Sequence, residues 1–246
     1  MRILPAFASL FALFLFFACK KDHSLEGGLY RHCSSCTYLP LCDSETFVYV
    51  DSNALAIDTL SGVVHIGSDT VINGLNYTRV SGLAVFHSGL IYNCDNQDYK
   101  TLLPLSTLGI TDSIVQQWLQ QLPFPVSPAQ LLLPSTIRTS FLKAALPAGA
   151  SWTDTIYQLS LPPLFRIFAG LDATVAEKGI RRTEFQHTYD QVIHVTQQLR
   201  VTSAAGNLPV PDMSLDYYFA PGAGLIELRI SKAQLTQNVI RLYAYR

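Results

Sequence analysis

The clearest pattern along this chain is an alternation of apolar and polar residues in its C-terminal half. Between Phe185 and Val201 most odd-numbered positions are apolar or aromatic, and most even-numbered positions are polar. Successive side chains of a strand point to opposite faces, so a period of two predicts a long antiparallel strand with one buried face. Further strands are predicted at Leu215–Phe219, Leu225–Ile230 and Val239–Tyr245.

Shorter runs of strand-forming residues occupy the N-terminal half. Phe47–Val50 and Val63–Ile66 are rich in β-branched and aromatic residues, and the sequence Gly67–Asp69 is expected to turn the chain. Asn73-Gly74 predicts a tight hairpin, because both residues tolerate the positive φ that such turns require. A second hairpin is expected at Ser88-Gly89.

The pattern becomes helical in the middle of the chain. One helix face is formed by the apolar residues Ile114, Val115, Trp118, Leu119 and Leu122. Thr111 or Asp112 is a suitable N-terminal cap, and Pro123 ends the pattern. A second short helix is predicted over residues 127–134, because its Ser-Pro start offers a cap and a favourable first residue. We expect residues 106–134 to form a helical insertion over one edge of a sheet.

These patterns together predict a mainly β fold with a small helical part. Consecutive strands joined by short turns are typical of an antiparallel meander. Such a sheet must curve to bury its apolar face, and a half-barrel is one arrangement that does so. The helical insertion around residues 106–134 would then lie against this curved sheet.

The N-terminus carries a separate signal. Arg2 precedes the apolar run Ile3–Ala18, which Cys19 follows directly. A positive start, a short apolar segment and a small residue at the cleavage site are the features of a secretory signal peptide. Because Cys19 stands just after the small residue, we interpret the segment as a bacterial lipoprotein signal that is cut before Cys19. A plain cleaved signal or an uncleaved anchor is the alternative.

Lipidation of Cys19 would make the membrane the first partner of this protein. Each buried methylene contributes about 0.8 kcal/mol, so two or three acyl chains hold a protein on a bilayer stably. Lys20 follows the cysteine where Asp would favour the inner membrane, so the outer membrane is favoured as the location in the cell envelope. The predicted organisation is a signal peptide over residues 1–18, a lipidated cysteine with its tether over 19–30, and a single β-rich domain over 31–246.

The composition and net charge limit the classes of function that this protein can have. The 246 residues include 17 Lys and Arg against 18 Asp and Glu, so the formal net charge is -1. A chain this balanced has no electrostatic reason to bind nucleic acid, and we expect no nucleic-acid partner. Charged residues make up only 14% of the chain, which argues against disorder and fits a β-rich exported domain.

Four cysteines remain once Cys19 is lipidated: Cys33, Cys36, Cys42 and Cys94. An even number in an exported chain predicts disulfides, and one bond is expected to join the N-terminal segment to Cys94. A zinc site is the alternative, since Cys33 and Cys36 are separated by two residues and His32 lies beside them. A second such pair is missing from the sequence, so disulfides are preferred.

The nearest approach to a catalytic pattern is the set Glu184, His187, Asp190 and His194. On the predicted strand, parity places His187 on the apolar face, as a core histidine, and the three others on the opposite face. Alternate residues of a strand lie about 6.6–7 Å apart, so Asp190 and His194 are too distant to share a metal easily. The sequence contains no common nucleophile, zinc or nucleotide motif. We therefore assign no catalytic, cofactor-binding or metal-binding residue.

An Asp–hydroxyl–aliphatic tripeptide occurs four times, with the hydroxyl residues Thr59, Thr70, Ser113 and Thr155. It resembles the O-glycosylation motif of exported proteins in the Bacteroidetes, which makes these four residues candidate acceptors. The alternative is that Asp followed by Thr or Ser only marks turns and helix caps. The sequence is compatible with both interpretations.

Several segments also resemble lipid-anchored, β-rich envelope lipoproteins of the Bacteroidetes. They are Ala18–Asp22, Asp69–Val80, Gly149–Trp152, Tyr189–Val195 and Tyr218–Ile226. The resemblance implies a curved antiparallel sheet, similar to the half-barrel of periplasmic lipoprotein carriers and their outer-membrane receptors. It implies no activity.

The function expected from these observations is that of a non-catalytic, lipid-anchored binding or assembly module. An apolar ligand held between sheet and helix is one version of this hypothesis. Docking of glycans or of an outer-membrane complex through surface aromatic residues is the second hypothesis. A hydrolase whose Ser, His and acid come from distant segments is the third.

Overall fold

The computed structural model describes most of the chain between Cys36 and Tyr245. The described residues are 36–39, 41–42, 44–53, 57–72, 74–81, 90–108, 110–120, 134–161, 165–203, 206–207, 210, 212–232 and 235–245. The chain divides into two compact units, Met1–Arg31 and His32–Arg246, and all described residues belong to the second. The predicted signal peptide, Cys19 and its tether therefore lie outside the described residues, as does Cys33.

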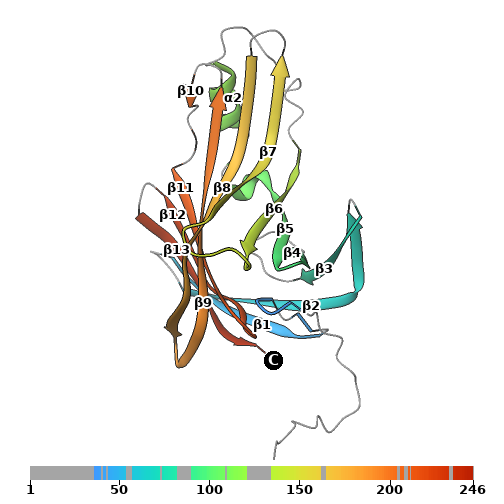
Figure 1. The fold of residues 1–246 in the computed structure, drawn as a ribbon, viewed down its shortest axis with the longest axis vertical. Coiled ribbons are helices and arrows are strands. Elements are labelled where there is room, and N and C mark those ends of the chain that lie inside the picture. Colours follow the sequence, from blue (N-terminus) through green and yellow to red (C-terminus); the bar gives the residue numbers. More distant parts are fainter. Residues whose placement is uncertain are drawn as a thin grey trace, which may run out of the picture. The chain divides into compact units, whose positions relative to one another are not determined.

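The described unit is dominated by β-strands (Figure 1). The strands are β1 (Thr46–Asn53), β2 (Ile57–Ile72), β3 (Leu75–Ser81), β4 (Leu90–Asp95), β5 (Asp98–Pro104), β6 (Thr136–Lys143), β7 (Ser151–Leu161), β8 (Phe165–Glu184), β9 (His187–Ser203), β10 (Gly206–Asn207), β11 (Met213–Ala220), β12 (Gly224–Lys232) and β13 (Leu235–Tyr245). The helical elements are the 3-10 turn η2 (Leu105–Leu108) and the helix α2 (Asp112–Gln120).

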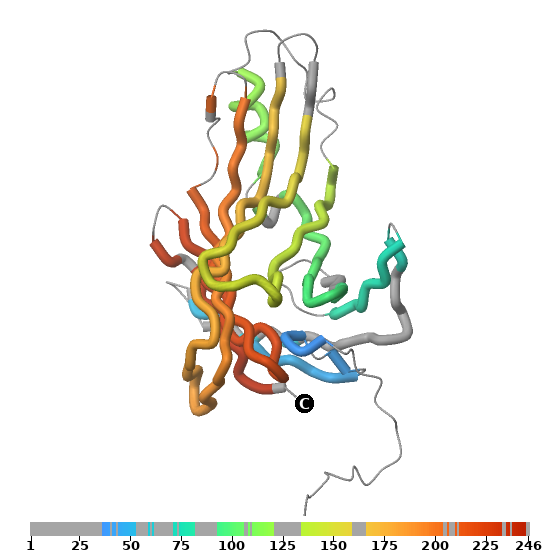
Figure 2. Tube along the Cα trace, viewed as in Figure 1, coloured from blue at the N-terminus to red at the C-terminus, as the bar shows by residue number. Residues whose placement is uncertain are grey.

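All these strands belong to one antiparallel sheet that follows the chain up and down. Its order is β6-β5-β4-β3-β2-β1-β13-β12-β11-β9-β8-β7, with β10 paired to β9. The first described strand, β1, pairs with the last, β13, as the blue and red segments of Figure 2 show. The strands β6 and β7, which are consecutive in the sequence, form the two edges of the sheet. This confirms the predicted mainly β meander, which is an open sheet.

The long strand predicted in the C-terminal half is confirmed as β9. Its odd-numbered residues Ile193, Val195, Leu199 and Val201 are buried. The strand begins at His187, because Phe185 and Gln186 form the turn that joins β8 to β9. The predicted burial pattern therefore holds over the second half of the segment.

The prediction of a core position for His187 is wrong, because His187 is exposed. Gln191 has a φ of 57°, and the pairing of β8 with β9 shifts register between Ile180 and Arg182. None of residues 187–191 is buried, on either face of the strand. These residues therefore belong to an exposed hairpin tip and do not continue the apolar face.

The N-terminal half contains one confirmed turn and one that is wrong. Gly74 has a φ of 77° and lies between β2 and β3, so the predicted hairpin at this position is confirmed. The turn predicted at Gly67–Asp69 does not exist, because β2 runs through it. The chain accommodates these residues as a register shift between His65 and Thr70 against β3. The first arm of the hairpin predicted at Ser88-Gly89 lies outside the described residues.

The predicted helix over the middle of the chain is confirmed as α2. The Thr111 carbonyl accepts a hydrogen bond from the Val115 N–H at 3.0 Å, at the start of the helix. Val115, Trp118 and Leu119 are buried, as the apolar face predicts. The second helix, predicted over 127–134, lies almost wholly outside the described residues. No helix in the described part of the chain is long and apolar enough to cross a membrane.

The core lies on one face of the sheet and contains side chains from both the N-terminal and the C-terminal strands. Phe141 of β6 contacts Tyr99 of β5 and Phe219 of β11, with ring centroids 6.4 and 5.4 Å apart. A disulfide between Cys36 and Cys94, which are 58 residues apart, ties the N-terminal segment to β4. This confirms the predicted bond to Cys94.

Cys42 is also disulfide-bonded. The zinc alternative loses one of its two candidate thiols, because Cys36 is oxidised. The described part of the chain contains no group of three or more side chains that could hold a metal ion.

Side chains connect the two edge strands where no ladder joins them. The Asp154 carboxylate in β7 accepts hydrogen bonds from the Ser140 N–H at 2.6 Å and from the Thr139 hydroxyl at 2.9 Å. The Ser140 carbonyl accepts two more, from the Trp152 indole at 3.2 Å and the Gln197 amide at 2.9 Å. These bonds satisfy a peptide group that an edge strand would leave open.

Candidate functional site

Two groups of polar side chains lie on the face of the sheet opposite the core, on the strands that follow β6. The first, here called the hairpin cluster, comprises Arg182, Glu184, Glu227, Arg229 and Arg241. Glu227 faces Tyr218 in β11 and Arg241 in β13 across the sheet, so these residues share one row. Arg182 and Glu184 come from the end of β8.

The hairpin cluster is a network in which each carboxylate contacts more than one guanidinium. Arg182 lies 2.7 Å from Glu227 and 2.8 Å from Glu184. Arg241 lies 3.0 Å from Glu184 and 3.2 Å from Glu227, and Arg229 also pairs with Glu227. The Glu227 side chain is fully buried and that of Glu184 is 8% exposed. A buried carboxylate needs such partners, because its charge would otherwise be costly.

These contacts fold the tip of the β8–β9 hairpin across the sheet. In the strand order, β9, β11 and β12 separate β8 from β13, yet Glu184 of β8 reaches Arg241 of β13. The next residue, Phe185, contacts Tyr243 of β13 with ring centroids 5.4 Å apart. Figure 1 shows the turn of this hairpin and the end of β13 at the same lower end of the view. The cluster therefore lies beneath the hairpin tip.

The pKa values of the two carboxyl groups of the cluster are shifted in opposite directions. Burial, together with the hydrogen bond to Glu227 and repulsion from its charge, raises the pKa of Glu184 to about 7. Burial acts in the same direction on Glu227, but hydrogen bonds from Glu184, Arg182 and Arg229 outweigh it and lower the pKa of Glu227 to about 2. Two carboxyl groups that share a site favour one proton between them.

Tyr218 connects the cluster to His194. The imidazole of His194 stacks on the Tyr218 ring at 4.2 Å, and the Arg182 guanidinium lies 3.7 Å from the ring centroid. His194 also contacts Glu177 at 3.3 Å and Asp216 at 3.0 Å. Burial is the main reason that the pKa of Tyr218 is raised. Both ring nitrogens of His194 already have carboxylate partners in this arrangement.

The structure separates the four residues of the His and acid pattern. Glu184 belongs to the hairpin cluster, and His194 lies between Glu177 and Asp216. Asp190 pairs with Arg181 at 2.6 Å on the surface. The exposed His187 lies near the Tyr189 ring, at 6.4 Å. These side chains do not converge on one point, and each contributes to a separate structural contact.

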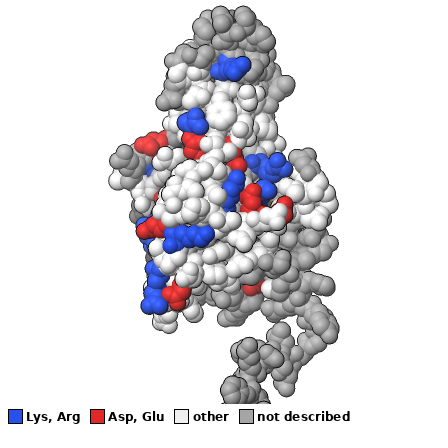
Figure 3. Space-filling model, viewed as in Figure 1, with Lys and Arg blue, Asp and Glu red and all other residues white. Residues whose placement is uncertain are grey.

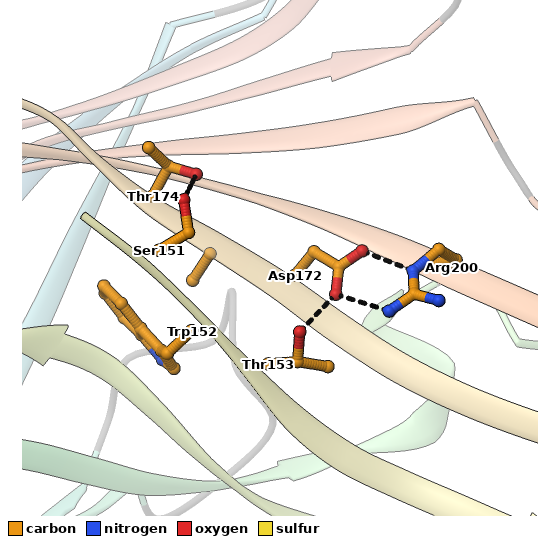
Figure 4. Close-up of a pocket in the computed structure, with 7 residues that line it drawn as sticks. Ser151, Trp152, Thr153, Asp172, Thr174 and Arg200 are labelled. Atoms are coloured by element: carbon orange, nitrogen blue, oxygen red, sulfur yellow. Dashed lines mark hydrogen bonds and ion pairs between the residues drawn. The ribbon is translucent and has the colours of Figure 1, made fainter. Parts of the chain in front are cut away.

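The second polar group lines a groove on the outer face of β7, β8 and β9. The groove has a volume of about 450 Å³, and its lining residues are Ser151, Trp152, Thr153, Asp172, Ala173, Thr174 and Arg200. Figure 4 shows Asp172 between Thr153 and Arg200, with Ser151 and Thr174 paired beside them. Pockets that hold small ligands have volumes of this order.

The polar groups of the groove orient one another. Asp172 accepts hydrogen bonds from both Arg200 Nε, at 2.6 Å, and Thr153 Oγ1, at 2.6 Å. The bond from Arg200 is the main reason that the pKa of Asp172 is lowered. Ser151 and Thr174 share a hydrogen bond of 2.8 Å. All these side chains retain some exposure to solvent, so they can also contact a ligand.

Gly170 and Phe168 lie on β8 next to the groove residue Asp172, at alternate positions of the same strand. A Cβ at Gly170 would lie 2.7 Å from the Phe168 ring and 2.8 Å from Thr153 Cγ2, so the ring covers the glycine. The Arg200 guanidinium lies 5.4 Å from the centroid of the same ring. An aromatic face beside fixed hydroxyl and carboxylate groups is therefore available at this surface.

Sequence reasoning missed the groove, although a signal for it was present. Phe168, Gly170, Asp172 and Thr174 occupy alternate positions of one strand, so parity alone places them on one face. Their partners on β7 and β9 are 10–34 residues away in the sequence, and only the register brings them together.

The candidate acceptor residues have different surroundings. Thr59, Ser113 and Thr155 are exposed, while the side chain of Thr70 lies outside the described residues. The Asp154 that precedes Thr155 binds the edge of β6, and the Asp112 that precedes Ser113 begins α2. Glycosylation at these four positions remains a prediction.

Charged side chains are sparse on the surface that Figure 3 shows, and both signs lie close together there. Exposed ion pairs of the described chain include Arg181 with Asp190 and Arg200 with Asp172. The described residues of the face in Figure 3 present no extended patch of one sign.

Comparisons with known proteins give a fold likeness at most. No family model and no curated protein sequence matches the chain. One similar solved structure is described as a “putative exported protein with YmcC-like fold” from Bacteroides fragilis; it is 7% identical, with a TM-score of 0.42 over 86% of this chain and 99% of that one. Another is a “putative lipoprotein” from Parabacteroides distasonis, 11% identical, with a TM-score of 0.43 over 87% and 100% of the two chains. No conclusion about function is drawn from a likeness at this level.

Proposed function

We propose that this protein is a lipid-anchored protein of the cell envelope that acts as a non-catalytic binding module. The proposed binding surface is the groove on β7, β8 and β9. The observation that carries the proposal is the contrast between two sets of polar residues. The carboxylates of the hairpin cluster are buried and paired, whereas Asp172 and Arg200 form a fixed polar pair that solvent still reaches.

The anchor is proposed from the N-terminal sequence. Arg2, the apolar run Ile3–Ala18 and Cys19 form the lipoprotein pattern, and the polar residues that follow would tether the domain. Two disulfide-bonded cysteines, Cys36 and Cys94, support export to an oxidising compartment. Lys20 favours the outer membrane.

Hydroxyl-rich saccharides are the ligand class that suits the groove best. The Asp172 carboxylate can accept from vicinal hydroxyl groups, the Arg200 guanidinium can donate to them, and the nearby Phe168 ring offers an apolar face. Docking of an envelope glycan is therefore the version of the binding hypothesis that we favour. An apolar ligand has less support, because the described core side chains contact one another, as Phe141 and Phe219 do.

The anchor is tested by the intact mass of the protein extracted from its native envelope. A mass of residues 19–246 plus acyl groups is expected, with thiols that appear only after reduction. Additional mass in hexose steps would identify glycosylation at the Asp–Thr or Asp–Ser motifs. A mass without acyl groups would contradict the anchor.

The groove is tested by sedimentation with purified peptidoglycan sacculi and with lipopolysaccharide. Arg200→Ala should lower the fraction that binds one of these glycans. Arg181→Ala is a matched control, because Arg181 forms an Arg–Asp pair of the same Nε–Oδ distance, 2.6 Å, away from the groove. Equal binding by the wild type and Arg200→Ala, to both glycans, would contradict glycan docking at this surface.

A further inference from the structure

We propose that Phe185 and Tyr243 form a second membrane contact, in which both rings enter the interfacial region of the bilayer that holds the lipid anchor. This inference rests on the proposed lipidation of Cys19. It adds a surface and an orientation: the tip of the β8–β9 hairpin faces the lipid, and the groove on β7, β8 and β9 stays in the aqueous compartment.

The two rings form an exposed aromatic pair. Phe185 is 48% exposed and Tyr243 is 56% exposed, and their centroids lie 5.4 Å apart in an edge-to-face arrangement. They come from positions 58 residues apart, at the hairpin turn and near the end of β13. Aromatic side chains are favoured at membrane interfaces, where an apolar ring meets lipid and a polar tip such as the Tyr243 hydroxyl meets water.

The backbone at Phe185 indicates that the ring is presented at a cost. Phe185 has a φ of 51°. This left-handed region suits Gly or Asn in a tight turn, whereas a bulky residue there is an outlier. Such strain at an exposed position commonly accompanies a binding role. A glycine would form the turn more easily, whereas Phe185 places an aromatic ring there, against Tyr243.

The hairpin cluster holds this aromatic pair in a fixed place. Glu184, directly before Phe185, lies 3.0 Å from Arg241, which is two residues before Tyr243 on the same face of β13. Arg182 binds Glu227 beneath them at 2.7 Å. These bonds connect the hairpin tip to β12 and β13, so both rings are offered together on a rigid support.

The chain that leads to the anchor enters the described structure beside the same hairpin. The Tyr38 hydroxyl donates a 3.3 Å hydrogen bond to the Gln191 carbonyl in β9, six residues from Phe185. The neighbouring Cys36 is fixed by its disulfide to Cys94. Sixteen residues separate Cys19 from Cys36, and they can span about 55 Å when fully extended. A tether of this length holds the described domain at a high effective concentration near the bilayer and allows the hairpin tip to reach it.

A bilayer is a better occupant than a charged macromolecule. Arg181, at the base of the tip, is paired with Asp190 at 2.6 Å. The hairpin cluster beneath the rings has three Arg against two Glu, so the surroundings of the rings carry a small positive charge. Two aromatic rings bind a lipid interface only weakly by themselves, but a second weak contact orients a protein that a lipid already holds. A second copy of the chain is the competing occupant, and the test separates the two.

The first test places a fluorescent reporter at the tip. The lipidated Phe185→Trp variant is reconstituted on vesicles of phosphatidylethanolamine and phosphatidylglycerol that contain a brominated lipid. Trp118 and Trp152 are buried and give a constant background. Emission from position 185 should shift to the blue and be quenched. Leu235→Trp is the matched control, because Leu235 is 68% exposed at the opposite end of β13, and its emission should not change.

The outcomes of this test distinguish the second membrane contact, the lipid anchor and association of two copies of the chain. An unquenched Trp at position 185 on protein that remains bound to vesicles would overturn the second contact and leave the anchor intact. Wild-type protein from the native envelope that does not bind the vesicles would contradict the anchor itself. A blue shift that depends on protein concentration, without vesicles, would identify a second copy as the occupant and overturn the proposal.

The second test measures the rings without the lipid. In a Cys19→Ser background, Phe185→Asn should lower partition onto the same vesicles about tenfold, the loss expected for part of a buried phenyl ring. Asn accepts a left-handed φ, so the turn should be retained, and an unchanged thermal unfolding curve would verify it. Leu235→Asn should leave partition unchanged. Equal partition of Phe185→Asn and its parent would overturn the proposal.

Discussion

The hairpin cluster and the groove contain the same chemistry in two different environments. Both join arginine to carboxylate on the face of the sheet opposite the core. In the cluster, Glu227 is fully buried and Glu184 is 8% exposed. In the groove, the Arg200 and Asp172 side chains are 45% and 39% exposed. Because the residue types are the same, differences between the two sites can be attributed to burial.

Burial assigns opposite roles to these two sites. A buried carboxylate is costly to leave without a partner, so every contact in the cluster is needed to hold the hairpin tip on β12 and β13. An exposed pair contributes little to stability, because water competes with it and salt screens it. Asp172 and Arg200 are therefore available to a ligand, whereas Glu227 is a structural residue.

The largest expected effect is from removal of the buried carboxylate. Glu227→Ala should lower the free energy of unfolding by about 3–5 kcal/mol, because it leaves Arg182, Arg229 and Arg241 without their shared partner. Chemical denaturation measures this value. Glu177→Ala is the matched control, since Glu177 is 55% exposed in the same row of the sheet. A loss below about 1 kcal/mol for Glu227→Ala would contradict the structural role.

A steric change tests the groove. Gly170→Ala should lower the free energy of unfolding by about 1–3 kcal/mol, because the added Cβ meets the Phe168 ring and forces it to move. The same change should also weaken any ligand that binds beside Arg200. In a Phe168→Ala background the substitution should cost less, because only the 2.8 Å contact of the added Cβ with Thr153 Cγ2 remains. A double-mutant cycle by denaturation measures the difference. Equal costs in both backgrounds would contradict the packing of this ring on Gly170.

The pH dependence of stability should reflect the shared proton of the cluster. The pKa of Glu184 is about 7 in the folded state against 4.5 in the unfolded chain, so its contribution is complete below about pH 4.5 and is lost as the pH rises through about 7. The pKa of Glu227 is about 2, so its contribution is present above about pH 4.5 and is lost as the pH falls toward about 2.

Glu184→Gln isolates the first of these two effects. The variant should show a flatter stability profile between about pH 5 and pH 8, while the acid limb that belongs to Glu227 remains. Denaturation at a series of pH values measures both limbs. An unchanged slope above about pH 5 would show that Glu184 does not hold the proton.

The smallest expected effect is in the exposed pair. Arg200→Ala should change the free energy of unfolding by less than about 1 kcal/mol, and added salt should reduce the difference further. Arg181→Ala should behave in the same way, since both pairs are exposed. A loss of several kcal/mol in Arg200→Ala would remove the distinction between the cluster and the groove.

Local patterns in the sequence were sufficient for much of the fold. The alternation in β9, the hairpin at Gly74 and the capped apolar face of α2 are all confirmed. Each depends on residues that are neighbours in the chain, where strand parity, turn conformation and helix capping act directly. The disulfide to Cys94 was likewise predictable, because the predicted export of the chain and its cysteine count favour it.

Tertiary structure decided the positions that local patterns placed wrongly. β2 continues through Gly67–Asp69 because its pairing with β3 absorbs these residues as a register shift. His187 is exposed because residues 187–191 belong to the tip of the β8–β9 hairpin, where neither face of the strand is buried. Both are properties of two strands together, and neither strand shows them alone.

The sequence by itself determined the strands, the short helix and the N-terminal lipoprotein pattern, since each follows from residues close together in the chain. Only the tertiary structure decided that Glu184 would meet Arg241, that Phe185 would meet Tyr243, and that Asp172 would stay open to solvent. The physical reason is that burial and charge pairing depend on which strands the sheet brings side by side. Residue type decides which interactions a side chain can make, and the curvature and register of the sheet decide which of them it does make.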